Sequence, residues 1–163
     1  MFIDTSARLA EVAGLRYDPK DELANDVVLD QGLLRVVGKG RRERVLPIGS
    51  RSIKALDRYV RDRAHHSEEK APWLWLGKKG RFTESGIAQM VRRRAADAGI
   101  GDVHPHQLRH TFAHTWLATG GQETDLTHLT GWRSRTTVSR YAASTAAART
   151  VDAHRRLSPG DRI

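Results

Sequence analysis

The sequence contains no cysteine and no long hydrophobic run. Without cysteine, neither a disulfide scaffold nor a zinc site built on thiolates can form. No apolar stretch approaches the ~20 residues that a membrane-spanning helix needs. The first residues do not combine a basic segment with an apolar one, as a secretory signal peptide would. These absences predict a protein that stays in the cytoplasm and has no membrane partner.

Positive charge is what the chain has in excess. Its 163 residues include 28 Lys and Arg against 19 Asp and Glu, which gives a formal net charge of +9. A strongly basic protein favours a polyanionic partner, most simply a nucleic acid. The length fits one domain, so we expect residues 1–163 to form a single unit.

The hydrophobic pattern predicts a mainly helical chain with a small antiparallel sheet near its start, which is an α+β fold class. Three aliphatic segments separated by glycine-containing turns predict a three-stranded meander at 27–29, 33–37 and 44–48. Apolar residues at helical spacing predict helices over 5–14, from Ser50 or Ser52 to Val60, over 83–98, from Pro105 to about 120, over 123–129 and over 142–157. Segment 73–76 is expected to be a strand or turn, and segment 134–141 a helix or turn.

A basic helix start at Pro105 is the first candidate site. Proline is favoured at the first position of a helix. His106, Arg109 and His110 then share one face, because they are three and four residues apart. Free backbone N–H groups beside an Arg and a His could bind a phosphate. The alternative is a solvated basic face with one histidine in the core, and the pentapeptide alone leaves both open.

Three further features are weak when taken singly. The turn 38–44 places Lys39 between two predicted strands, either on a mobile loop that reaches a phosphate or in solvent. Arg8 and Glu11 lie one turn apart on the first predicted helix, where they could simply form a surface ion pair. Tyr141 follows a polar segment, and a single tyrosine usually packs or lies at the surface.

A metal site is the rival interpretation of the histidines. His106, His110 and His114 follow one another at every fourth position, a spacing that can present ligands from one helix. The zincin pattern, however, needs glutamate at the position of Gln107. No cluster of carboxylates or cysteines completes a site, and catalytic zinc usually takes three protein ligands. We therefore expect no metal.

Four separated motifs occur in a fixed order. They are 5–12 (TSARLAEV), 38–47 (GKGRRERVLP), 106–113 (HQLRHTFA) and 129–132 (LTGW), the last with Tyr141 nine residues later. Together they resemble the T-G-x-R-x-x-E-L helix, the G-K-G-x-K-x-R-x-x-P hairpin, the H-x-L-R-H-T-F-A segment and the L-L-G-H segment with its following tyrosine of the tyrosine recombinase (phage integrase) family. Single short motifs mislead, whereas four in register are specific. The resemblance implies the catalytic-domain fold of that family.

The resemblance also implies a set of active-site residues. The catalytic residues would be Arg8, Lys39, His106, Arg109, Trp132 and Tyr141, with Glu11 and His110 in support. Tyr141 would attack a DNA phosphate to form a covalent 3′-phosphotyrosine, so that neither a metal nor another cofactor is required. The two arginines would hold the non-bridging oxygens, and Lys39 would protonate the departing 5′-oxygen. His106 would assist proton transfer at the tyrosine oxygen, whereas Trp132 can only donate a hydrogen bond and support the tyrosine ring.

The activity and partners of the family follow as expectations. The chain would be a site-specific recombinase or integrase that breaks and rejoins double-stranded DNA in the cytoplasm, associated with the nucleoid; type IB topoisomerases use similar chemistry. We expect a tetrameric homo-oligomer on DNA for a full-length protein, a monomer in isolation, and segment 142–157 either docked on a neighbour or frayed. The candidates for contact with DNA phosphates are Arg41, Arg42, Arg81, Arg92, Arg93 and Arg94.

The sequence departs from the family pattern at four points. Ser6 stands where the family has glycine, Thr130 where it has an apolar residue, and Trp132 where many members have histidine. Family members carry a DNA-clamping domain and further helices before the motif that contains Arg8, so we expect an N-terminally truncated catalytic domain. Two alternatives stay open. One is a catalytically impaired DNA-binding remnant of an integrase, and the other is a basic RNA- or DNA-binding module whose motif match is accidental.

Overall fold

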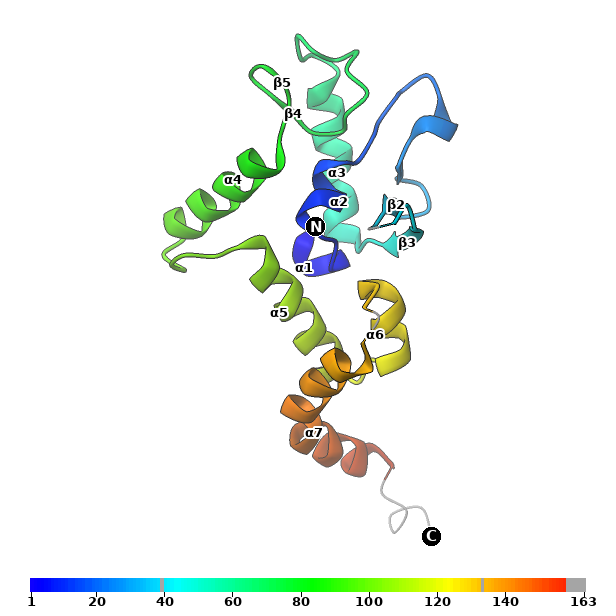
Figure 1. The fold of residues 1–163 in the computed structure, drawn as a ribbon, viewed down its shortest axis with the longest axis vertical. Coiled ribbons are helices and arrows are strands. Elements are labelled where there is room, and N and C mark those ends of the chain that lie inside the picture. The colour runs from blue at the N-terminus through cyan, green and yellow to red at the C-terminus, as the bar shows by residue number, and fades with distance from the viewer. Residues whose placement is uncertain (39, 133, 158–163) are drawn as a thin grey trace.

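The computed structural model describes residues 1–38, 40–132 and 134–157 (Figure 1). Its helices are α1 (Phe2–Thr5), α2 (Leu9–Ala13), α3 (Ser50–Arg63), α4 (Glu84–Asp97), α5 (Pro105–Ala118), α6 (Glu123–Thr130) and α7 (Arg135–Leu157), with a short 3₁₀ helix at Glu22–Ala24. Its strands are β1 (Val27–Val28), β2 (Leu33–Val37), β3 (Glu43–Pro47), β4 (Leu76–Gly77) and β5 (Gly80–Arg81). The predicted mainly helical α+β class is confirmed.

The larger sheet is the predicted antiparallel meander, with strand order β1-β2-β3. Side chains alternate between its two faces. On the inner face Leu34 pairs with Leu46, and Val36 pairs with Arg44. The second sheet pairs β4 with β5. Of segment 73–76, which is expected to be a strand or turn, only Leu76 lies in β4, and β5 is not predicted by the sequence pattern. The tight β4–β5 hairpin needs Gly80, whose φ of 100° suits glycine.

The predicted helix over 5–14 is wrong in its first half. The chain forms α1 and α2 instead, separated by Ser6, which has a left-handed φ of 52°. A left-handed residue cannot continue a right-handed helix. Arg8 then begins α2 from an extended conformation, and its backbone N–H donates to Glu11 Oε2 at 2.7 Å. The break turns Arg8 and the Ser6 carbonyl towards the later helices.

The other helices follow the predictions closely. Pro105 occupies the first turn of α5, and Thr83 caps α4 by accepting from the Gly86 N–H at 3.2 Å. Helix α3 begins at Ser50, one of the two predicted starts, and its N-cap residue is Gly49 rather than a serine. Residues 135–141 and 142–157 belong to one continuous helix, α7, which runs away from the body of the molecule in Figure 1. None of the helices in the described residues is both long and apolar enough to cross a membrane.

Two hydrophobic clusters stabilise the fold. One joins α1, α2, the meander, α3 and the start of α4. The other joins α5, α6 and α7 around Phe112, Leu117 and Leu126. Leu129 of α6 packs against both clusters, and α1 packs on α5. All four sequence motifs meet where these two halves join, the hairpin motif through Arg44, which contacts Glu11.

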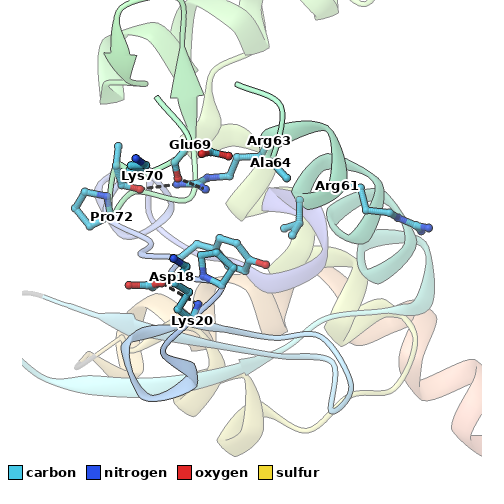
Figure 2. Close-up of a pocket in the computed structure, with 12 residues that line it drawn as sticks. Asp18, Lys20, Arg61, Arg63, Ala64, Glu69, Lys70 and Pro72 are labelled. Carbon is cyan, nitrogen blue, oxygen red and sulfur yellow. Dashed lines mark hydrogen bonds between the residues drawn. The ribbon is translucent and has the colours of Figure 1, made fainter. Parts of the chain in front are cut away.

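A buried arginine organises the connection after α3, away from that junction. Arg63 is 3% exposed, and its guanidinium donates to the carbonyl oxygens of Glu69 at 2.9 Å and Trp73 at 2.8 Å, and also to those of Ala71 and Leu74. Figure 2 shows Arg63 at the wall of a cavity of about 480 Å³, with Lys70 and Pro72 on the facing segment. Every donor of Arg63 that faces this loop has a carbonyl partner, so its role there is structural.

Candidate active site

A buried carboxylate lies at the centre of the site. The Glu11 side chain is 2% exposed and accepts from Arg8 Nη1 at 2.8 Å and from Arg44 Nη2 at 2.5 Å. A buried charge is costly unless it is paired, and here two guanidinium groups pair with one carboxylate. Arg8 remains 39% exposed, and its Nη2 donates to the Gly131 carbonyl at 3.2 Å. Glu11 thus holds Arg8 at the surface of the site.

Arg109 approaches the same place from α5. It is 3% exposed, and it donates to the carbonyl oxygens of Ser6 and Thr130. The left-handed Ser6 turns its carbonyl towards α5, and Thr130 is the last residue of α6. Arg109 therefore ties together three elements that are far apart in sequence.

The cluster carries more positive than negative charge. Burial, followed by repulsion from Arg8 and Arg44, lowers the pKa of Arg109 to about 10. Burial also lowers the pKa of Arg44, against the opposing effect of Glu11. Three guanidinium groups face a single carboxylate, so a bound anion would relieve their repulsion. Strongly perturbed ionisable groups of this kind are typical of functional sites.

Aromatic rings continue the site from Arg109 to α7. The Arg109 guanidinium carbon lies 5.3 Å from the centre of the Trp132 ring. The Trp132 ring in turn stacks on Tyr141, with centroids 5.2 Å apart and planes at 6°. His110 stacks on Tyr141 at 5.5 Å, and His106 meets His110 edge to face at 4.2 Å. These contacts connect the arginine cluster to the tyrosine within one chain.

His110 is the perturbed histidine of this group. Burial, helped by the nearby His106 and Arg109, lowers its pKa from the ordinary value of 6.5. Its Nδ1 atom is buried and has no hydrogen-bond partner among the described residues. The lowered pKa favours the neutral form of His110 beside Tyr141.

A groove of about 790 Å³ opens beside the arginine cluster. It runs between the β2–β3 hairpin and the end of α6, and its lining includes Arg8, Arg42, Arg44, Gly131 and Trp132. A groove with basic walls attracts and holds polyanions. Lys39, which belongs to the same hairpin, lies outside the described residues.

The structure brings together most of the residues expected at the site. Arg8, Glu11, Arg109, Trp132, Tyr141, His110 and His106 form one connected set of contacts. Their catalytic roles stay predictions, as does the role of Lys39.

The six candidates for DNA phosphates do not share one location. Arg42 lines the groove, and Arg41 is exposed beside it in a left-handed conformation with φ of 56°. Arg81 instead lies over the Trp73 ring at 3.6 Å. The other three lie exposed on α4: Arg92 beside Asp102 and His104, Arg94 beside Asp97, and Arg93 between them in sequence. All six stay predictions.

Arg44 is the site residue that the motifs did not single out. Its position in the alternation of β3 is the signal that could have found it, because Leu46 and Ile48 are buried and Arg44 falls on the same face. A charged residue on the core face of a strand needs a buried partner. Glu11 is that partner.

The histidines do not form a metal site in the described part of the chain. No three His, Cys, Asp or Glu side chains converge there in a way that could hold a metal ion. His106 and His110 are in ring contact, while His114 is exposed one turn further along α5.

The sequence of this chain is similar to those of proteins whose family is known. The family described as "Phage integrase family" matches residues 1–148. The tyrosine recombinase XerC of Pelobacter propionicus is 36% identical over 132 residues, which cover 79% of this chain and 43% of that protein. XerC of Xylella fastidiosa is 33% identical over 143 residues, which cover 86% of this chain and 45% of that protein. The chain thus spans about half the length of the curated relatives it matches.

Solved structures share the fold. The crystal structure of XerA recombinase superimposes with a TM-score of 0.78 at 28% identity, covering 97% of this chain and 54% of that chain. The XerH site-specific recombinase bound to its difH substrate superimposes with a TM-score of 0.70 at 23% identity, covering 86% of this chain and 40% of that chain. The second likeness concerns the fold alone. With the family match extending over residues 1–148, the chain belongs to the phage integrase family.

Proposed function

We propose that this chain is the catalytic part of a site-specific recombinase that cleaves and rejoins DNA through a covalent 3′-phosphotyrosine at Tyr141. The observation that carries the proposal is the contact path from three arginines through Trp132 to Tyr141. An anion-attracting cluster and a nucleophile of the required type lie at its two ends. The resemblance of four motifs and the membership of the family support the same chemistry.

The reaction exchanges one phosphate ester for another. The Tyr141 oxygen forms a bond to the DNA phosphorus while the bond from phosphorus to the 5′-oxygen breaks. The tyrosine proton leaves towards His106, and the 5′-oxygen receives a proton from Lys39. Attack by a 5′-hydroxyl later reverses these steps and releases the tyrosine, so the bond energy is conserved.

The arginines stabilise the phosphate during both transfers. Arg8 is exposed enough to donate to a non-bridging oxygen, and Arg109 lies behind it in the buried part of the cluster. Planar guanidinium groups match the geometry of phosphate oxygens. Trp132 adds an indole N–H and supports the tyrosine ring.

Double-stranded DNA is the proposed partner. The XerH neighbour is bound to a difH substrate, and the Tn1549 transposon integrase, another neighbour in fold, is in complex with transposon right end DNA. The basic groove and the net charge of +9 favour the same partner here. A tetramer on DNA, association with the nucleoid, and a single catalytic domain over residues 1–163 complete the proposal.

A DNA-binding remnant without turnover is the second candidate. Ser6 favours it, because this residue is strained in a left-handed conformation where the family motif has glycine. Its carbonyl accepts from Arg109, so the strain lies directly beside the arginine cluster.

Covalent capture separates the two candidates. The protein is mixed with a pool of nicked duplexes that carry randomised centres, and adducts that survive SDS are collected. An adduct that disappears in Tyr141→Phe supports the recombinase. Salt-dependent duplex binding without an adduct favours the remnant, and loss of duplex binding contradicts both.

A further inference from the structure

Arg44 occupies an unusual position for a charged residue. It lies on the inner face of β3, directly opposite Val36, and its neighbour on the same face is the fully buried Leu46. Its side chain is 14% exposed. Burial of an arginine at a strand position that suits an aliphatic residue is costly unless the charge is paired.

Two contacts define what Arg44 does there. On one side its Nη2 pairs with Glu11 Oε2 at 2.5 Å. On the other side its Nη1 packs so closely on Gly131 that a Cβ at position 131 would overlap it. Gly131 ends α6 in a left-handed conformation with φ of 62°, and its carbonyl accepts from Arg8 Nη2 at 3.2 Å. Arg44 and Arg8 therefore enclose the Gly131 backbone.

The residue after Gly131 makes this enclosure relevant to the chemistry. Trp132 follows directly and stacks on Tyr141. The same two arginines that enclose Gly131 are paired with Glu11, and Arg44 belongs to the hairpin that carries Lys39. The Arg44 guanidinium thus connects the hairpin from which it projects to the Glu11 carboxylate and to the turn that leads to Trp132.

We infer that Arg44 is a positioning residue. It links the Gly131 turn to Glu11 and so fixes the positions of Arg8 and Trp132 relative to each other around the DNA phosphate. The inference rests on the proposed function. Without Arg44, Glu11 keeps only Arg8 as a counter-charge, and the carboxylate then competes with the phosphate for that arginine. The Gly131 turn also loses the surface against which it packs.

A comparison of binding with cleavage tests the inference. The substrate is a nicked duplex obtained from the covalent-capture experiment. We measure the affinity for this duplex, and the single-turnover rate of adduct formation at saturating duplex, for wild type, Arg44→Met and Arg44→Lys. We expect Arg44→Met to slow adduct formation about 10–100-fold, while duplex affinity changes less than about threefold because the side chain is mostly buried. Arg44→Lys should recover part of the rate, since an ammonium still neutralises Glu11 but cannot reach Glu11 and Gly131 together.

Arg58→Met is the matched control, since Arg58 is an exposed arginine of α3. It removes the same charge and should keep the wild-type rate. An Arg44→Met protein that folds cooperatively and cleaves within about threefold of wild type would overturn the inference.

A second measurement does not depend on cleavage. Gly131→Ala is introduced into wild type and into Arg44→Ala, and the midpoints of urea unfolding are compared. If Arg44 seats the turn, the loss caused by Gly131→Ala should be at least halved in the Arg44→Ala background, since only the cost of the left-handed backbone remains. An equal loss in both backgrounds would overturn the inference, and this holds even if wild type forms no Tyr141-dependent adduct and the proposed function fails.

Discussion

The Trp132 indole lies nearly parallel to the Tyr141 phenol ring, with planes 6° apart and centroids separated by 5.2 Å. Tyr141 also stacks on His110, so two rings from two other segments contact the residue proposed as nucleophile. The tyrosine is thereby oriented by its own chain before DNA arrives. An oriented nucleophile loses less entropy on reaching the transition state.

Trp132→Ala should slow adduct formation about 10–100-fold, because it removes both a ring contact worth ~0.5–1.5 kcal/mol and an N–H donor. Single-turnover cleavage of a nicked duplex at saturating concentration measures the effect. Trp132→Phe separates the two contributions, since it keeps a ring and lacks the N–H. Cleavage by Trp132→Ala at the wild-type rate would show that the stack has no part in the reaction.

Ser6→Gly should stabilise the protein by about 0.5–1 kcal/mol. A non-glycine residue in the left-handed region costs about 1–2 kcal/mol. Glycine removes this strain but loses more chain entropy on folding, which cancels part of the gain. The Ser6 hydroxyl contributes little, because its contact with the Leu129 carbonyl is 3.4 Å long. Urea unfolding measures the change. Ser6→Ala is the control; it keeps the strain and should be no more stable than wild type, and a destabilised Ser6→Gly would contradict the explanation.

The elements that the sequence predicts are those in which local pattern and tertiary packing agree. The meander follows from aliphatic segments and glycine turns, and α5 begins at Pro105 as expected. The division of the first helix was missed, because helical spacing of apolar residues continues across Ser6 and only its φ of 52° reveals the break. The strands β4 and β5 are too short to leave a periodic signal.

The site shows the same limit more clearly. Arg8 and Gly131 are joined by a hydrogen bond across 123 positions of sequence, which no local spacing can indicate. The resemblance to the family predicted that these two segments share one site, because the family's motifs contain residues of a single active site. Arg44 belongs to the motif at 38–47, but its role follows only from the strand register that turns it towards Glu11.

Inorganic phosphate should stabilise the protein by binding to the arginine cluster. At a tenfold excess over its dissociation constant the gain is about 1.4 kcal/mol, or roughly 3–6 °C in Tm for a chain of this size. Thermal unfolding with phosphate against chloride at equal ionic strength measures the gain. Arg8→Met should reduce it, because Arg8 is the exposed member of the cluster. An equal shift with chloride would mean that ionic strength alone is responsible.

Arg63→Met should destabilise the protein by about 2–4 kcal/mol, since it leaves buried carbonyl oxygens without donors. In wild type the guanidinium bonds to Glu69, Ala71, Trp73 and Leu74. Urea unfolding checks this. The control is Arg61→Met, which removes an exposed arginine paired with Asp57 on the same helix and should cost less than about 0.5 kcal/mol. Similar losses in the two variants would show that Arg63 does not organise the connection.

Removing His110 should flatten the pH dependence of stability. Burial, with help from His106 and Arg109, lowers the pKa of His110 below 6.5, so between the two pKa values the unfolded chain binds more protons than the folded one. The contribution of His110 to the free energy of unfolding is therefore complete above about pH 6.5 and is lost as the pH falls through the lowered pKa. Urea unfolding between pH 7 and pH 5 should show a shallower loss for His110→Gln than for wild type. His114→Gln, an exposed position on the same helix, should keep the wild-type slope. If both variants lose stability with wild-type steepness, another group accounts for the acid sensitivity.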